Sequence, residues 1–130
     1  MDYKNNTPIY IQIMNLIKNE IINEKINCGE QLPSIRDISV KYMVNPNTMQ
    51  KVFKELEREG IVFTKRGTGT FVTENYSIVK TLKENIANEI MDSFLESMKD
   101  LGFDHEEIIK NINNRMKKGE KDVTADQKYK

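Results

Sequence analysis

The chain has 130 residues, and its 20 lysine and arginine residues balance 20 aspartate and glutamate residues, so the formal net charge is zero. No stretch approaches the roughly 20 apolar residues that a membrane-spanning helix needs, the first five residues lack the pattern of a signal peptide, and Cys28 is the single cysteine. These features exclude a disulfide framework and predict a cytoplasmic protein of one small domain plus an appendage.

Two helices are predicted in the first third of the chain. Thr7 followed by Pro8 is typical of a helix start, and apolar residues recur at helical spacing as far as Ile21, which predicts a helix over about residues 8–25. Ser34 with Asp37 resembles a capping box and predicts a short second helix over residues 34–42.

A third helix is predicted to begin at Asn45-Pro46 and to end at Gly60. One of its faces is apolar, formed by Met49, Val52, Phe53 and Leu56. The opposite face is polar or basic and holds no acid: Asn47, Thr48, Gln50, Lys51 and Lys54. Two helices joined by a tight turn, the second exposing such a face, indicate a helix-turn-helix.

A β-hairpin is predicted next, with strands at residues 61–65 and 70–73 and the tip Arg66-Gly67-Thr68-Gly69. The two glycines could also belong to a nucleotide-binding loop. Such a loop lies between a strand and a helix, however, whereas here a second strand follows. We therefore interpret the hairpin as a wing, in which glycines allow a close approach to DNA while Arg66 contacts the minor groove or a phosphate.

Two further helices are predicted after the wing. The first has apolar residues at every fourth position from Ile78 to Phe94 and stops at Gly102. The second starts at Asp104, with Glu107 as the capping partner, and becomes polar after Lys117.

These two helices bury too little apolar surface by themselves to form an independent core. We expect two copies of the chain to pack their apolar faces together as a homodimer, and the contact residues that we predict are Leu82, Ile86, Ile90, Phe94, Ile108 and Ile112. The alternative is that the helices fold back on their own winged domain. The predicted fold is α+β and mostly α: a winged helix-turn-helix (1–75), a helical dimerisation region (76–118) and a disordered tail (119–130).

The local charge permits nucleic-acid binding even though the whole chain is neutral. Residues 34–73 hold seven basic and four acidic residues, for a net charge of +3. Phosphate attraction depends on a local positive face rather than on the sum over the chain.

Four segments, in order, are similar to the GntR family of transcriptional regulators: Gly29-Glu30-Gln31-Leu32-Pro33-Ser34-Ile35-Arg36-Asp37-Ile38-Ser39, Asn45-Pro46-Asn47-Thr48-Met49-Gln50-Lys51, Leu56-Glu57-Arg58-Glu59-Gly60, and Arg66-Gly67-Thr68-Gly69-Thr70-Phe71-Val72. The short C-terminal part resembles the YtrA subfamily. This resemblance implies a small dimeric repressor, often of a transporter operon, whose duplex DNA operator is palindromic.

The residues that we predict to contact DNA lie at the start of the second helix, at the start of the third helix and at the wing tip: Arg36, Asn45, Pro46, Asn47, Thr48, Gln50, Lys51, Arg66, Gly67, Thr68 and Gly69. Alternatives stay open for several of them. Arg36 could form a surface ion pair, Asn45 could act as a helix cap, and Pro46 could serve only to start the helix. Lys51 is at most a phosphate contact.

Related family members often carry arginine at the positions of Pro46 and Gln50. Because Pro46 and Gln50 replace these arginines, we predict that amide groups read the bases and that DNA affinity depends only weakly on salt concentration.

A second function class is also open, namely a winged helix for protein contacts or for DNA or plasmid maintenance without promoter control.

No catalytic constellation, cofactor motif or metal site is apparent, and the single histidine, His105, sits at a predicted helix start. We therefore predict that the chain is not an enzyme. The segment after the wing is too short for a deep effector pocket, so an effector, if there is one, would bind at a dimer interface, and the sequence names none.

Overall fold

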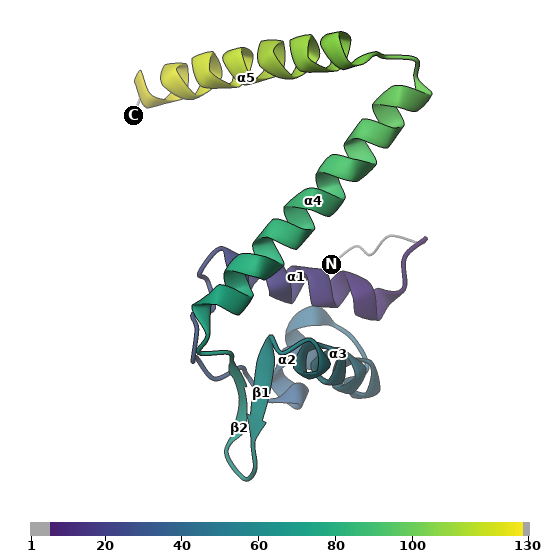
Figure 1. Cartoon of the computed structure of the whole chain (residues 1–130). Helices are drawn as coiled ribbons and strands as arrows, with labels where there is room; N and C mark the ends of the chain where they lie inside the picture. The colour runs from purple at the N-terminus through teal and green to yellow at the C-terminus, as the bar shows by residue number, and fades with distance from the viewer. Residues whose placement is uncertain (1–5, 129–130) are drawn as a thin grey trace. The chain divides into compact units, whose positions relative to one another are not determined.

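The computed structural model describes residues 6–128, while the side chains of residues 120–128 are outside the described set. Five helices and one hairpin follow in the order α1 (Ile9–Ile22), α2 (Ile35–Tyr42), α3 (Pro46–Arg58), β1 (Val62–Lys65), β2 (Gly69–Val72), α4 (Tyr76–Asp100) and α5 (His105–Lys128) (Figure 1). This confirms the predicted α+β, mostly helical fold class.

The chain divides into two compact units, Met1–Ile86 and Ala87–Lys130, and α4 passes from the first into the second. The first unit extends beyond residue 75, where the sequence suggests that the winged domain ends, because Val79 of α4 is buried in its core. The helix α5 continues to Lys128, through most of the segment predicted to be a disordered tail. That prediction stays a prediction, because the end of this segment lies outside the described residues.

Helix α3 is the central element of the first unit, since it packs against α1, α2 and β1. The core that they share is apolar, and its most fully buried side chains are Ile13, Ile17, Tyr42, Met49, Val52, Leu56, Ile61 and Val72. Burial of the apolar stripe of α3 leaves the opposite, polar face of this helix at the surface.

The starts of α2 and α3 are fixed by the side chains that the sequence indicates. The Ser34 hydroxyl accepts a hydrogen bond from the Asp37 backbone N–H at 3.1 Å, and the Asn45 side-chain oxygen accepts one from the Asn47 N–H at 2.8 Å. The predicted start of α1 is wrong by one residue. Pro8 is the N-cap and makes no side-chain cap, so the Thr7 hydroxyl does not cap this helix.

The turn between α2 and α3 uses a left-handed residue, Met43, with φ of 53°. Its backbone N–H bonds to carbonyls of the last turn of α2, and the Val44 N–H bonds to the Ser39 carbonyl at 3.0 Å. This single residue reverses the chain within a short span, which is why α2 and α3 form the expected helix-turn-helix.

The hairpin is antiparallel, with Lys65 opposite Gly69 and Val62 opposite Val72. A short segment before α2, residues 29–32, runs along the outer edge of β2. The Gly29 and Leu32 N–H groups donate to the carbonyls of Val72 and Thr70 at 3.0 and 2.8 Å. This segment is a third, irregular strand that joins the wing to the helix-turn-helix.

The second unit consists of the end of α4 and of α5. Asp104 and Glu107 cap α5 reciprocally, as the sequence indicates, because each side chain accepts a hydrogen bond from the other residue's backbone N–H, at 2.9 and 3.2 Å. Ile108 is 3% exposed within this unit, whereas Ile90 is 65% and Leu101 74% exposed.

Within the part of the chain that the structure describes, no helix is both long and apolar enough to cross a membrane.

Candidate DNA-binding surface

The first turn of α3 carries exposed polar side chains and no acid. Asn45, Asn47 and Gln50 are exposed, while Thr48 is half-buried and Met49 points into the core. Asn45 caps the helix through its side-chain oxygen, which leaves its amide N–H groups available. Both roles considered for Asn45 are therefore compatible, and contact with a base edge stays a prediction.

Lys51 does not extend freely from α3. Its Nζ atom lies 3.9 Å from the centroid of the Tyr10 ring on α1, which is a close cation–π geometry. Lys54, one turn further along α3, is exposed. The sequence contains no local signal for the Lys51 contact, because its partner lies on another helix.

Arg36 lies in the first turn of α2, directly after the capped start at Ser34, and its side chain is exposed. It forms no ion pair with any residue that the structure describes. This observation disfavours a surface ion pair as the reason for an arginine at this position. The nearby Lys41 does form such a pair, with Glu20 at 3.6 Å.

The wing tip is a tight turn between two antiparallel strands, which agrees with the wing interpretation rather than with a nucleotide-binding loop. The Thr68 N–H donates to the Lys65 carbonyl at 3.0 Å, and Gly67 has φ of 79°, a value that glycine adopts without strain. Arg66 is exposed beside them. Below the tip, the rings of Phe63 and Phe71 stack across the strands with centroids 5.7 Å apart.

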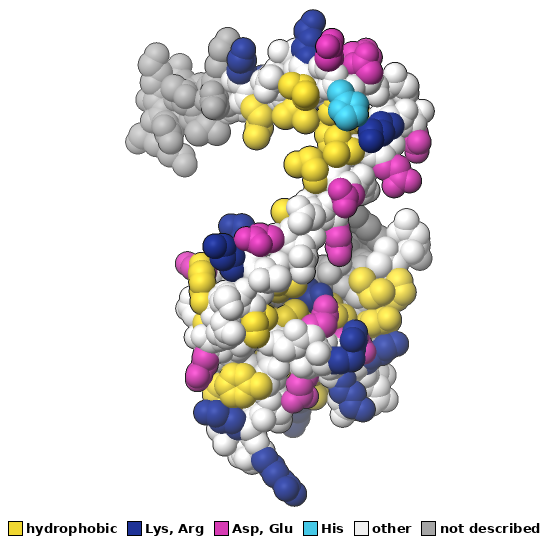
Figure 2. All heavy atoms as spheres, viewed as in Figure 1, with side chains coloured by type: hydrophobic (Ala, Val, Ile, Leu, Met, Phe, Trp, Pro, Cys, Tyr) yellow, Lys and Arg dark blue, Asp and Glu magenta, His cyan; other side chains and the backbone are white. Residues whose placement is uncertain are grey.

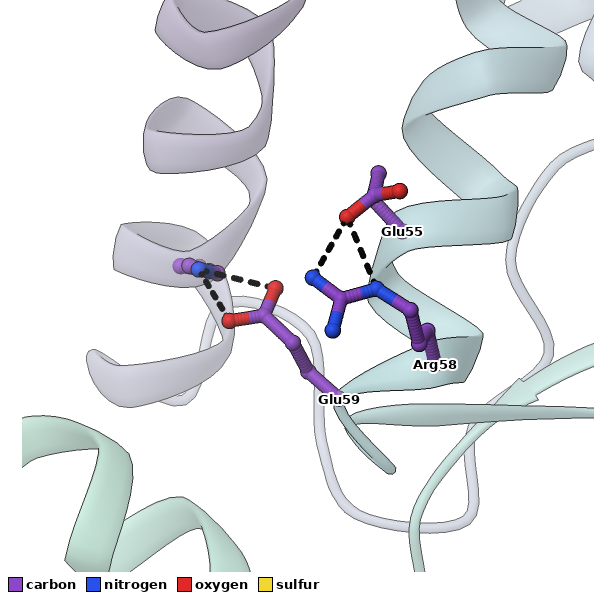
Figure 3. A network of polar contacts seen from close by, with 4 residues as sticks. Glu55, Arg58 and Glu59 are labelled. Carbon is purple, nitrogen blue, oxygen red and sulfur yellow. Dashed lines mark hydrogen bonds and ion pairs between the residues drawn. The ribbon is translucent and has the colours of Figure 1, made fainter.

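Other basic side chains of the first unit are paired with acids at the far end of α3. Arg58 donates from Nη2 and Nε to one carboxylate oxygen of Glu55, at 2.7 and 3.1 Å, and Lys18 bonds to Glu59 at 3.2 Å (Figure 3). The hydrogen bond from Arg58 lowers the pKa of Glu55, and the same bond raises the pKa of Arg58. Arg58 therefore adds little net charge to the protein surface.

The exposed basic groups of the first unit are interspersed with acids rather than gathered in one broad patch. In Figure 2, a basic side chain projects from the lower end of the hairpin, and others lie over the α2 and α3 region with acidic side chains between them. Those of the expected DNA-contacting segments are Arg36, Lys51, Lys54, Lys65 and Arg66, all exposed. The surface is only modestly basic, as the charge count over residues 34–73 predicts.

Gln31 lies in the first GntR-like segment and is not among the predicted DNA contacts. Its side-chain Nε2 donates to the Thr68 carbonyl at 3.0 Å, so it connects the segment before α2 to the wing tip. The two residues are far apart in the chain, and no periodic pattern could have indicated this contact.

The residues predicted for dimerisation differ in their surroundings. Ile90 and Phe94 are exposed, whereas Ile108 is buried inside the second unit and Leu82 packs partly against the core of the first. The second unit also has a groove of about 500 Å³ with a mostly apolar lining, formed by Phe94, Met98, Phe103, Asn111, Ile112, Arg115 and Met116.

Among the described residues, no group of three or more histidine, cysteine, aspartate or glutamate side chains could hold a metal ion.

Comparison with known proteins finds a family of bacterial regulators. Residues 9–72 match the model of the bacterial regulatory proteins of the gntR family. The chain is 39% identical to the HTH-type transcriptional regulator YhcF of Bacillus subtilis (strain 168), over 85% of this chain and 91% of that protein. It is 37% identical to the HTH-type transcriptional repressor YtrA of the same organism, over 72% of this chain and 76% of that protein.

Solved structures show the same similarity. A GntR family transcriptional regulator from Listeria monocytogenes superposes with a TM-score of 0.81 at 35% identity, covering 86% of this chain and 98% of that one. The DNA-binding domain of AraR, in a complex with the operator ORR3, matches 56% of this chain and 88% of that one, with a TM-score of 0.51 and 25% identity.

Proposed function

The chain belongs to the GntR family of bacterial regulatory proteins, and from this premise we propose that it is a repressor that binds a palindromic operator as a homodimer. The observation that carries the proposal is the exposed, acid-free first turn of α3, together with an exposed arginine on the neighbouring α2, Arg36, and another at the wing tip, Arg66. A recognition helix contacts base edges mainly from its N-terminal residues, which are the polar ones here.

Each part of this surface has a role in the proposal. Asn47 and Gln50 read adenine edges in the major groove through paired amide hydrogen bonds. Arg36 binds a phosphate or a guanine edge, for which a guanidinium without an ion-pair partner among the described residues is suited. Arg66 enters the adjacent minor groove or binds a phosphate.

The homodimer is supported by the apolar side chains that the second unit leaves exposed, which include Ile90, Met91, Leu101, Ile109 and Met116. Large exposed apolar patches are uncommon on monomers. A second copy would cover these side chains, seat in the groove next to Phe94, and present a second winged domain to the other half of a two-fold operator.

We propose that the protein represses transcription by occupying a promoter. The similarity to the repressor YtrA supports this direction of control. By resemblance to the YtrA subfamily, we propose a transporter operon as the target.

The test is a selection of bound sequences from a random pool of duplex DNA with the full-length protein. We expect a consensus with two-fold symmetry, and we expect the same sequence near a promoter whose transcription rises when the gene for this protein is deleted. A set of bound sequences without a consensus would contradict promoter control and would favour the alternative, a winged helix for protein contacts or for DNA maintenance.

A further inference from the structure

The segment of residues 29–32 places the Gln31 side chain beside the wing. Besides the bonds to β2 already described, the Val72 N–H donates to the Glu30 carbonyl at 2.9 Å, and Gln31 pairs with Phe71 across an antiparallel bridge. In an extended segment, successive side chains point to opposite sides. Leu32 is buried in the core, so Gln31 faces outward, next to the hairpin.

From this position Gln31 makes a contact at the wing tip. Its Nε2 atom donates to the Thr68 carbonyl at 3.0 Å. The next residue, Gly69, makes room for this amide, because a Cβ atom there would lie 2.5 Å from the Gln31 Nε2. Glycine at this position therefore also serves the approach of Gln31.

A two-stranded hairpin is only marginally ordered by itself. In the tip, the Thr68 N–H donates to the Lys65 carbonyl, and the Gln31 side-chain amide donates to the Thr68 carbonyl. Gln31 also lies in the segment that leads directly into the capped start of α2. It therefore connects the two elements that carry Arg36 and Arg66.

We propose that Gln31 is a positioning residue that fixes the wing tip, and with it Arg66, relative to the helix-turn-helix, and so raises DNA affinity without itself binding DNA. This inference rests on the proposed function, because it assigns a role in DNA binding. It differs from a role in overall stability, since the Gln31 side chain is exposed and water can replace its hydrogen bond when the chain is not bound to DNA.

The test uses the full-length variant Gln31→Met, which keeps the length of the side chain and removes the donor without adding a charge. The control is Asn27→Leu, which removes an exposed amide from the same part of the chain. Backbone ¹⁵N relaxation without DNA should show lower order parameters at Thr68 and Gly69 in Gln31→Met alone. The unfolding temperature should stay close to that of the wild type in both variants.

A double-mutant cycle with Arg66→Ala provides the second readout, with the selected duplex as the probe. If Arg66→Ala weakens binding tenfold in the wild type, it should weaken binding threefold or less in the Gln31→Met background, because a mobile tip already loses most of the Arg66 contact. Equal factors in the two backgrounds, or unchanged relaxation at the tip, would overturn the inference. A wild-type protein that binds the selected duplex no better than a shuffled one would instead refute the proposed function, while the relaxation data would still decide whether Gln31 orders the tip.

Discussion

The ammonium group of Lys51 on α3 lies 3.9 Å from the centre of the Tyr10 ring on α1. The contact joins a residue of the expected DNA-binding face to the helix that packs behind it. Lys51 and Lys54 are both exposed, but the contact with Tyr10 partly commits Lys51 to the fold of the first unit.

We predict that Lys51→Ala lowers the free energy of unfolding by about 0.5–1 kcal/mol, the usual contribution of a cation–π pair near the surface. The same change should weaken DNA binding less than Lys54→Ala does. Urea denaturation and titration of the selected duplex measure the two effects. Lys51→Arg keeps a cation over the ring and serves as the control; if Lys51→Ala were as stable as Lys51→Arg, the contact would not contribute to stability.

We predict that Arg36→Ala and Arg66→Ala each weaken operator binding by about 1–3 kcal/mol, because each removes a charged contact to DNA. Arg58→Ala is a matched control, since Arg58 is also exposed but is held by Glu55 at the other end of α3. The operator affinity of Arg58→Ala should equal that of the wild type. Affinities that are unchanged for both Arg36→Ala and Arg66→Ala would refute the proposed contact surface while leaving the fold untouched.

Much of the fold could be predicted because its signals are local in the sequence. Ser34 and Asn45 mark the starts of α2 and α3, and Asp104 with Glu107 marks the start of α5, because a capping side chain bonds to a backbone group only two or three residues away. At Thr7 the same local rule gave a wrong start, since Pro8 itself is the N-cap of α1.

The contacts that organise the candidate site could not be predicted in this way. Gln31 meets Thr68, and Lys51 meets Tyr10, only after the helices and the hairpin have packed together. Such pairs depend on the register between elements, which no single-element pattern contains. Residue types and capping patterns thus indicated which segments we propose to contact DNA, whereas the structure shows how those segments are held.

We predict that Gln50→Arg makes DNA binding more sensitive to salt. An added arginine on the exposed first half of α3 can neutralise one more phosphate, so the slope of log K against log salt should steepen by about 0.9 per bound subunit. Titrations of the selected duplex at several salt concentrations measure this slope, with Gln50→Met as the uncharged control. A slope equal to that of the wild type would mean that position 50 does not face the DNA.

We predict that Ser39→Ala stabilises the protein. Ser39 is 3% exposed, and its hydroxyl has no hydrogen-bond partner among the described residues. Removing an unsatisfied buried hydroxyl should raise the free energy of unfolding by about 1–3 kcal/mol. Chemical denaturation measures the change. A gain of about 0.5 kcal/mol or less is what the higher helix propensity of alanine would give by itself, and it would show that the hydroxyl is satisfied in solution.

We predict that Ile90→Asp converts the proposed dimer into a monomer that is still folded. Ile90 is 65% exposed within its own subunit, so an aspartate costs that subunit little packing, whereas at an interface with a second copy it would bury an unpaired charge. Sedimentation at micromolar concentration should give the mass of two chains for the wild type and of one chain for the variant.

The same variant should bind a two-fold symmetric site about 100-fold more weakly, because linked half-sites gain roughly 10²–10⁴ in affinity from simultaneous binding. Its affinity for a single half-site should be unchanged. Asn88→Asp is the control: it places the same charge in α4 two residues away, on the opposite side of the helix, where the side chain is exposed. A wild-type chain that sediments as a monomer would exclude the dimer, and equal losses in the two variants would place the interface elsewhere on α4.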